Sequence, residues 1–212
     1  MKVLSLTTSV LPFVVQIHRA AFPDSALTKL GAEAVRRYYL WLLTGPHDAV
    51  NVGAFDDQNN LVGFCFGGKF RGALSGFLQQ NRGFLIRTVL MRPWLLGNEI
   101  FRERLSLVFN IFRRLRKKSR STTAVKKEVS QPKRNSFGIL AIAVDPQRQK
   151  TGAGRAIMEY CEQIAIQQGF QFMDLTVHPT NHNAVAFYER LGWERVLEQG
   201  EWKGRMTKSL VR

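Results

Sequence analysis

The segment from Phe137 to Val177 constrains the fold more than any other part of the chain. It contains an apolar run rich in Ile, Leu and Val over Phe137–Val144, a turn with glycines, a helical pattern over Gly154–Gln168 and a strand-like run over Phe172–Val177. Gly169 follows the helix at the position of a C-cap. A β-α-β unit of this kind pairs its strands in parallel through a right-handed crossover. We therefore expect a parallel strand pair within an α/β sheet.

The flanking residues add further strands and helices. Val50–Phe55 and Leu61–Gly67, separated by a polar turn, form the clearest hairpin in the sequence. The other expected elements are a strand at Val3–Leu6, helices from about Thr7 to Ala21, over Ala32–Leu43 and over Ala184–Leu191, and closing strands at Trp193–Leu197 and Trp202–Leu210. We predict one α/β domain over residues 1–212, with a central mixed β-sheet flanked by helices.

Composition excludes several classes of protein. A chain of 212 residues that is 45% hydrophobic can bury a core and is not a disordered protein. Cys65 and Cys161 provide neither a disulfide framework nor a CxxC pair, and the four histidines form no HExxH motif, so no metal site is predicted. The N-terminus lacks a signal-peptide pattern, and no apolar stretch approaches the ~18 residues of a membrane span. We expect a cytoplasmic protein.

The turn between Val144 and Gly154 predicts an anion site. Gly152 and Gly154 allow the main chain to approach a ligand closely, and the start of the helix offers N–H groups and a positive dipole end to a phosphate. Nearby basic side chains are Arg148, Lys150 and Arg155. A Walker A loop is excluded because no Lys follows Gly154, and the dinucleotide fingerprint is excluded because Ile157 replaces its third glycine. A tight turn that merely needs glycine is the alternative.

Three motifs, in order, resemble those of the GNAT superfamily of N-acetyltransferases. QKTGAG at residues 149–154 resembles the acetyl-CoA motif Q/R-x-x-G-x-G/A, Asn181–Trp193 resembles N-x-x-A-x-x-F-Y-x-x-x-G-F, and Met206–Leu210 is similar to the closing strand. The resemblance is strong over Phe137–Leu210 and moderate over Met1–Gly67. It implies a GNAT-type fold that transfers an acetyl group from acetyl-CoA to an amine by direct attack in a ternary complex.

The resemblance also implies which residues hold the acetyl donor. Main-chain groups on the fourth strand would hold the pantetheine arm and polarise the thioester carbonyl, a role that falls to Ile142, Ala143 and Val144. The pyrophosphate would be cradled by Gln149, Lys150, Thr151, Gly152, Ala153, Gly154 and Arg155. Asn181 matches the cofactor-contacting Asn of the family, and a helix N-cap is its alternative interpretation.

Two side chains are candidates for proton transfer. Tyr188 matches the Tyr that many members use as a general acid, because a phenol with pKa ≈ 10 can protonate a departing thiolate; a core Tyr beside Phe187 is the alternative. The strand Phe137–Val144 lacks the carboxylate that some members keep, so the base stays open. His178, at the end of the next strand, is the best local candidate, with a His-Pro turn residue as the alternative. Weaker candidates are His18, Asp24 and Glu33.

The insertion over residues 68–135, between the third and fourth strands, does not match the family. It contains a predicted amphipathic helix at Phe101–Lys117 and, over Arg113–Arg134, ten basic residues and one acidic residue, so that this stretch holds +9 of the chain's +15 charge. Three interpretations remain: helices over the acceptor side with a solvated basic loop, peripheral contact of residues 101–134 with an anionic membrane surface, or nucleic-acid binding. The last lacks aromatic interleaving and is the least favoured.

The sequence leaves the acceptor open among an amino sugar, a sugar nucleotide, a polyamine and a protein amine. It also leaves the acyl chain and the oligomeric state open. The alternative function is a non-catalytic module that binds CoA or an anionic surface on a GNAT-like fold. Tyr188 and the intact 149–154 motif favour the enzyme.

Overall fold

The computed structural model describes residues 1–70, 72–92 and 135–211, and every structural statement concerns these ranges. The predicted helix Phe101–Lys117 and the basic run Arg113–Arg134 lie outside the described residues. Within the described ranges, no helix is long and apolar enough to cross a membrane.

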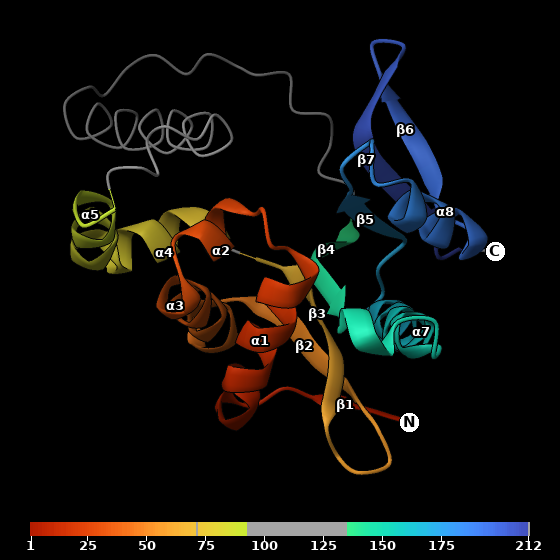
Figure 1. The fold of residues 1–212 in the computed structure, drawn as a ribbon. Coiled ribbons are helices and arrows are strands. Elements are labelled where there is room, and N and C mark those ends of the chain that lie inside the picture. The colour runs from red at the N-terminus through yellow and green to blue at the C-terminus, as the bar shows by residue number, and fades with distance from the viewer. Residues whose placement is uncertain (71, 93–134, 212) are drawn as a thin grey trace.

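Seven strands form one mixed sheet, which confirms the predicted fold class (Figure 1). Their order is β1-β2-β3-β4-β5-β7-β6; β4 and β5 are parallel, and all other neighbours are antiparallel. The strands are β1 (Lys2–Ser5), β2 (Asp48–Phe55), β3 (Leu61–Lys69), β4 (Ser136–Val144), β5 (Phe172–Thr176), β6 (Glu194–Glu198) and β7 (Glu201–Ser209).

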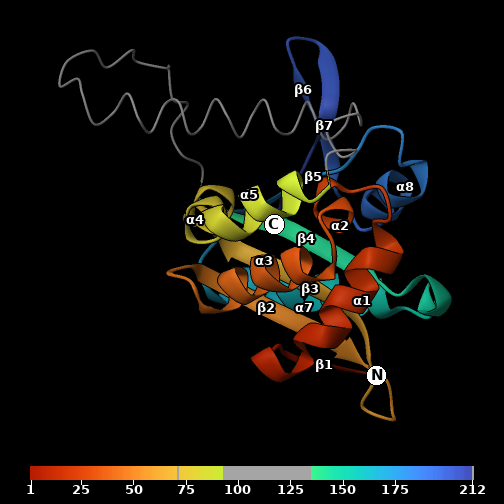
Figure 2. The same ribbon diagram turned by 60° about the vertical axis from the view of Figure 1, so that its left-hand side comes forward.

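Helices cover both faces of the sheet. α1 and α3 pack on one face, which we call the α1 face, and α7 packs on the other, the α7 face (Figures 1 and 2). The described helices are α1 (Leu11–Ala21), α2 (Ala26–Lys29), α3 (Ala32–Thr44), α4 (Ala73–Gln80), α5 (Arg82–Leu90), α7 (Ala153–Gln167) and α8 (His182–Arg190), with 3-10 turns η1 (Thr8–Val10) and η3 (Pro146–Arg148). The hairpin of β6 and β7 projects beyond the helices in both views.

Each face of the sheet has its own apolar core because successive strand residues point to opposite sides. In β4, Phe137 and Ile139 enter the α7 core, whereas Ala143 enters the α1 core. The α7 core also holds Cys65, Ile157, Met158, Cys161, Met173 and Met206, all at most 3% exposed. The α1 core holds Val14, Val35, Tyr39, Leu42, Phe64 and Phe66, all at most 1% exposed.

Local structure departs from the sequence prediction at a few points. The helix predicted from about Thr7 begins as the 3-10 turn η1 at Thr8 and becomes α-helical only at Leu11. The short helix α2 was not predicted, and it forms because Ser25 Oγ accepts the N–H of Thr28 at 3.1 Å. β3 continues to Lys69, so the insertion starts after that residue, and its described part contains α4 and α5.

Candidate functional site

The parallel strands β4 and β5 separate halfway along β4. Their pairing ends at Ile139 and Leu175, and β4 then runs on to Val144 with no described strand beside it on this side. The next residue, Leu140, is unpaired on the β3 side and forms a β-bulge. A bulge bends its strand and disrupts the local ladder. A gap in the sheet follows, with main-chain groups of β4 along one edge.

The antiparallel register shows which main-chain groups line this gap. The N–H of Asp145 donates to the carbonyl of Val62 at 2.9 Å, so the polar groups of Asp145 point towards β3. The direction alternates along a strand. The polar groups of Ala143 therefore also point to β3, whereas those of Ile142 and Val144 face the gap. The structure thus separates Ala143 from the two neighbours with which the sequence grouped it.

The loop after β4 has a main-chain geometry that few residues adopt. Lys150 has φ of 63° and Gly152 has φ of 90°, both in the left-handed region. A Cβ added at Gly152 would meet no atom within 4 Å, so the space beside it is open. Thr151 fixes the turn by donating its hydroxyl to the carbonyl of Arg148 at 2.8 Å. Such left-handed loop residues turn successive N–H groups into a concave anion site.

α7 begins directly at this loop. No side chain caps it at Gly152, and its first turn carries no acidic residue. Gly154 lies close to the ring of Phe187, where an added Cβ would sit at 3.3 Å from the ring. Arg155 is exposed and lies 4.0 Å from Glu159. The uncapped N–H groups and the positive end of the helix dipole therefore face the loop, which suits a phosphate or pyrophosphate.

The other predicted donor contacts lie in different environments. Gln149 is exposed and extended at the end of η3. Ala153 is buried in the α7 core with 1% exposure, so only its main chain can serve a ligand. Asn181 acts as the N-cap of α8, with Oδ1 accepting the N–H of Ala184 at 3.2 Å. This is the capping role named above as the alternative interpretation of Asn181.

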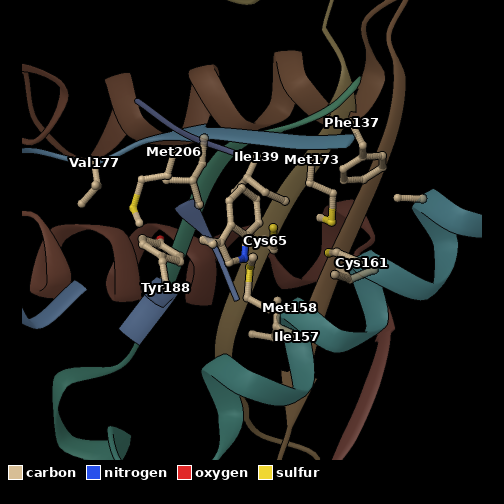
Figure 3. Close-up of a cluster of buried hydrophobic side chains, with 14 of the residues drawn as sticks. Cys65, Phe137, Ile139, Ile157, Met158, Cys161, Met173, Val177, Tyr188 and Met206 are labelled. Carbon is tan, nitrogen blue, oxygen red and sulfur yellow. The ribbon is translucent and has the colours of Figure 1, made fainter. Parts of the chain in front are cut away.

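Tyr188 lies at the end of the α7 core nearest the gap. Figure 3 shows its ring at the same end of the cluster as Val177 and Met206, away from Phe137. Burial raises the pKa of Tyr188 well above its usual value, so the phenol stays protonated at neutral pH. His178 follows β5 and is exposed, with Nδ1 2.8 Å from Thr180 Oγ1. His178 therefore directly follows Val177, which lies at the same end of the core as Tyr188.

The weaker base candidates have partners of their own. The hydrogen bond from Arg36 is the main reason that the pKa of Glu33 is lowered to about 2, and Asp24 pairs with Lys29 at 2.9 Å. His18 is buried, and burial lowers its pKa to about 4. These three groups are therefore occupied by structural contacts. Within the described ranges, no three His, Cys, Asp or Glu side chains gather as metal ligands would.

Sequence reasoning overlooked a carboxylate beside the gap. Asp174 lies in β5, one residue before the last pair with β4, and is the single charged residue of that strand. The available signal was an isolated Asp within an otherwise apolar run. The pattern could not show whether its face of the sheet is covered.

Comparisons with known proteins agree with this geometry. Residues 109–193 match the family model of the acetyltransferase (GNAT) family. Ribosomal-protein-S18-alanine N-acetyltransferase from Escherichia coli is similar in fold, with 16% identity, a TM-score of 0.55 and coverage of 100% of this chain and 94% of the other. PaiA N-acetyltransferase from Thermoplasma acidophilum, solved with coenzyme A, has 13% identity and a TM-score of 0.56, and the match covers 98% of both chains. No curated protein sequence matches.

A third similar structure carries the acetyl donor itself. It is a phosphinothricin acetyltransferase from Sinorhizobium meliloti in complex with acetyl-CoA, with 14% identity, a TM-score of 0.56 and coverage of 98% of this chain and 87% of the other. This chain shares with these structures the overall fold in which the mixed sheet of β1–β7 is built. The match over residues 109–193 and the likeness to these solved structures agree with a GNAT-type fold.

Proposed function

We propose that this protein is an N-acetyltransferase that moves an acetyl group from acetyl-CoA to a primary amine in a ternary complex. The observation that supports this most is the gap where β4 leaves β5 after Ile139, which leads directly into the glycine loop and the start of α7. A donor lying along β4 would meet main-chain groups at the gap and an anion site beyond it.

The residues present fit the donor. The main chain of Ile142 and Val144 would hold the pantetheine arm, and the 149–154 loop with the first turn of α7 would hold the pyrophosphate. The open space beside Gly152 leaves room for phosphate oxygens. Acetyl-CoA supplies an activated acyl carbon. The amine nitrogen bonds to that carbon as the carbon–sulfur bond breaks.

Tyr188 would give its proton to the leaving thiolate. The hydroxyl stays protonated because burial raises its pKa, and it lies at the end of the core near the gap (Figure 3). A thiolate (thiol pKa ≈ 8.5) is a weaker base than a phenolate, so proton transfer from the phenol is not favoured by pKa alone. Departure of the thiolate is nevertheless accelerated when the proton donor is held beside the sulfur.

His178 would accept the proton that the amine loses. The Nδ1 atom of its ring faces Thr180 Oγ1 at 2.8 Å, which leaves Nε2 for the acceptor. The acceptor amine must be neutral to attack, and an alkylamine with pKa ≈ 10.4 is almost fully protonated at pH 7. A proton acceptor beside the gap is therefore required.

The fold does not select the acceptor. The similar structures are described as acting on substrates as different as a ribosomal protein alanine, phosphinothricin and aminoglycosides. We therefore propose a primary amine without restriction to a small molecule such as an amino sugar or to a protein amine.

The test is release of CoA thiol from acetyl-CoA with a panel of amines, for the wild type, Tyr188→Phe and Tyr160→Phe. Tyr160 is a half-buried Tyr of α7 and serves as the control. We expect Tyr188→Phe to lower kcat about 100-fold, since a positioned acid contributes at least that much, while CoA affinity and the Tyr160→Phe rate stay as in the wild type. CoA binding without thiol release from any amine would instead support the non-catalytic module.

A further inference from the structure

Asp174 lies on the face of the sheet that the α7 core does not use. Its neighbours along β5, Met173 and Leu175, are at most 6% exposed and belong to the α7 core. Because side chains alternate along a strand, Asp174 points to the α1 face. Its side chain keeps 19% exposure, and Thr176, two residues further along the same face, is exposed. The described residues therefore cover this part of the α1 face only partly.

No side chain from the neighbouring strands covers Asp174 on the β4 side. Asp174 pairs with Gly138 in β4, and Gly138 pairs with Gly68 in β3. Directly paired residues point to the same face. The sheet beside Asp174 is thus bare main chain over two strands, which leaves the carboxylate at the edge of a shallow floor.

The charge of Asp174 is only partly compensated. Arg205 Nη2 lies 3.5 Å from Oδ1, which is an ion pair without a hydrogen bond. Oδ1 is buried, and no described residue donates a hydrogen bond to it. Buried carboxylate oxygens normally accept hydrogen bonds, because an unmade one is costly. The negative charge of Asp174 is therefore not fully satisfied by the described residues, and part of the carboxylate stays exposed.

Asp174 lies next to the reaction centre proposed above. The last residue pair between β4 and β5 is Ile139–Leu175, so Asp174 lies one residue before the gap opens. The donor would enter the gap from the α7 face, where the glycine loop and α7 lie. The acceptor must then arrive from the α1 face, which is the face that Asp174 occupies.

We infer that Asp174 binds the ammonium group of the acceptor and thereby makes the enzyme selective for cationic amines. This inference rests on the proposed function. Asp174 is an anchor and not the base, because the proposed function gives the proton-accepting role to His178. A bound ammonium would contact the exposed part of the carboxylate and would hold the nitrogen beside the thioester until its proton leaves.

The test compares acceptor kinetics of the full-length wild type, Asp174→Asn, Arg205→Gln and the remote control Asp48→Asn. Asp174→Asn keeps the shape of the side chain and removes its charge. Acceptors are a linear diamine, an amino sugar, a peptide with a free N-terminus and a hydrazide, which is uncharged at neutral pH. Thiol release gives KM for each acceptor and for acetyl-CoA, and isothermal titration gives CoA affinity separately.

We expect Asp174→Asn to raise KM for the cationic acceptor about 10- to 100-fold, the size of a hydrogen bond to a charged group. KM for acetyl-CoA and for the hydrazide stays within twofold. Arg205→Gln is expected to leave the cationic KM unchanged or to lower it, because it removes the competing cation. Asp48→Asn, on exposed residue 48 of β2, behaves as the wild type.

Three results would overturn the inference, each in a recognisable way. An unchanged cationic KM in Asp174→Asn removes the ammonium contact and leaves the transferase intact. Equal rises in Asp174→Asn and Arg205→Gln mean that Asp174 only maintains an ion pair within the sheet. If CoA binds but the wild type releases thiol with no acceptor, the proposed function itself fails and takes the inference with it.

Discussion

The buried imidazole of His18 predicts a loss of stability on mild acidification. His18 is 7% exposed in α1 and contacts two groups, with Nδ1 2.8 Å from Tyr39 Oη and Nε2 3.4 Å from Ser25 Oγ. Ser25 gives its own hydroxyl proton to Thr28 Oγ1. Nε2 must therefore be the donor to Ser25, and Nδ1 accepts from Tyr39. Protonation would put a second N–H against the Tyr39 hydroxyl, inside the α1 core.

The size of the effect follows from linkage. Burial lowers the pKa of His18 from 6.5 to about 4. Between these values the unfolded chain binds a proton that the folded protein does not bind, so stability falls as pH falls from about 6.5 towards 4. The full contribution is about 3 kcal/mol, and about 2 kcal/mol of it is lost between pH 7 and pH 5.

The assay is urea unfolding of the wild type and His18→Gln at pH 7 and pH 5. His18→Gln keeps a polar side chain but cannot titrate, so the wild type should lose about 2 kcal/mol more than the variant over this interval. Groups common to both proteins, such as His47, whose pKa is also lowered by burial, cancel in the comparison. Equal losses in the two proteins would refute the reasoning.

Two further predictions concern single positions. Gly204 has φ of 94°, and an added Cβ would overlap the carbonyl oxygen of Val177, so Gly204→Ala should cost about 3 kcal/mol. Gly200→Ala, at φ of 86° in open space, should cost only about 1 kcal/mol, and equal melting temperatures would contradict this contrast. Asp145 Oδ1 accepts the N–H of Gln147 at 3.0 Å, so Asp145→Ala should cost about 1 kcal/mol and weaken CoA binding by calorimetry. Unchanged CoA affinity would separate this cap from the anion site.

The fold could be predicted where one element carries its own pattern. Three segments have a clear pattern of apolar residues and form as expected: the strand at Phe137–Val144, the helix after Gly154 and the hairpin that includes Leu61. The short helix α2 has too few residues for a periodic signal, so its cap at Ser25 was the only clue. The Cα register and the face of each strand depend on tertiary pairing and were not visible.

The candidate site was predictable only in part for the same reason. A loop that requires glycine can be recognised from the sequence, because the residue type itself is constrained. Main-chain groups are the same in every residue, so nothing in the sequence distinguished Ala143 from Ile142. The contact of His18 with Tyr39 requires α1 to pack on α3. Asp174 became a candidate only when its face, its glycine neighbours and its distance from the gap were known.

The opening between β4 and β5 also has a mechanical consequence. Within the sheet, four residue pairs connect β4 to β5 across this junction, and the α7 core packs side chains from both sides of it together. A coenzyme bound in this gap as proposed would contact both β1–β4 and β5–β7 and would connect the two parts of the sheet. Since any ligand of the native state raises its stability by mass action, bound coenzyme would add to the contacts that already join the two halves, and this added stability would rise with coenzyme concentration.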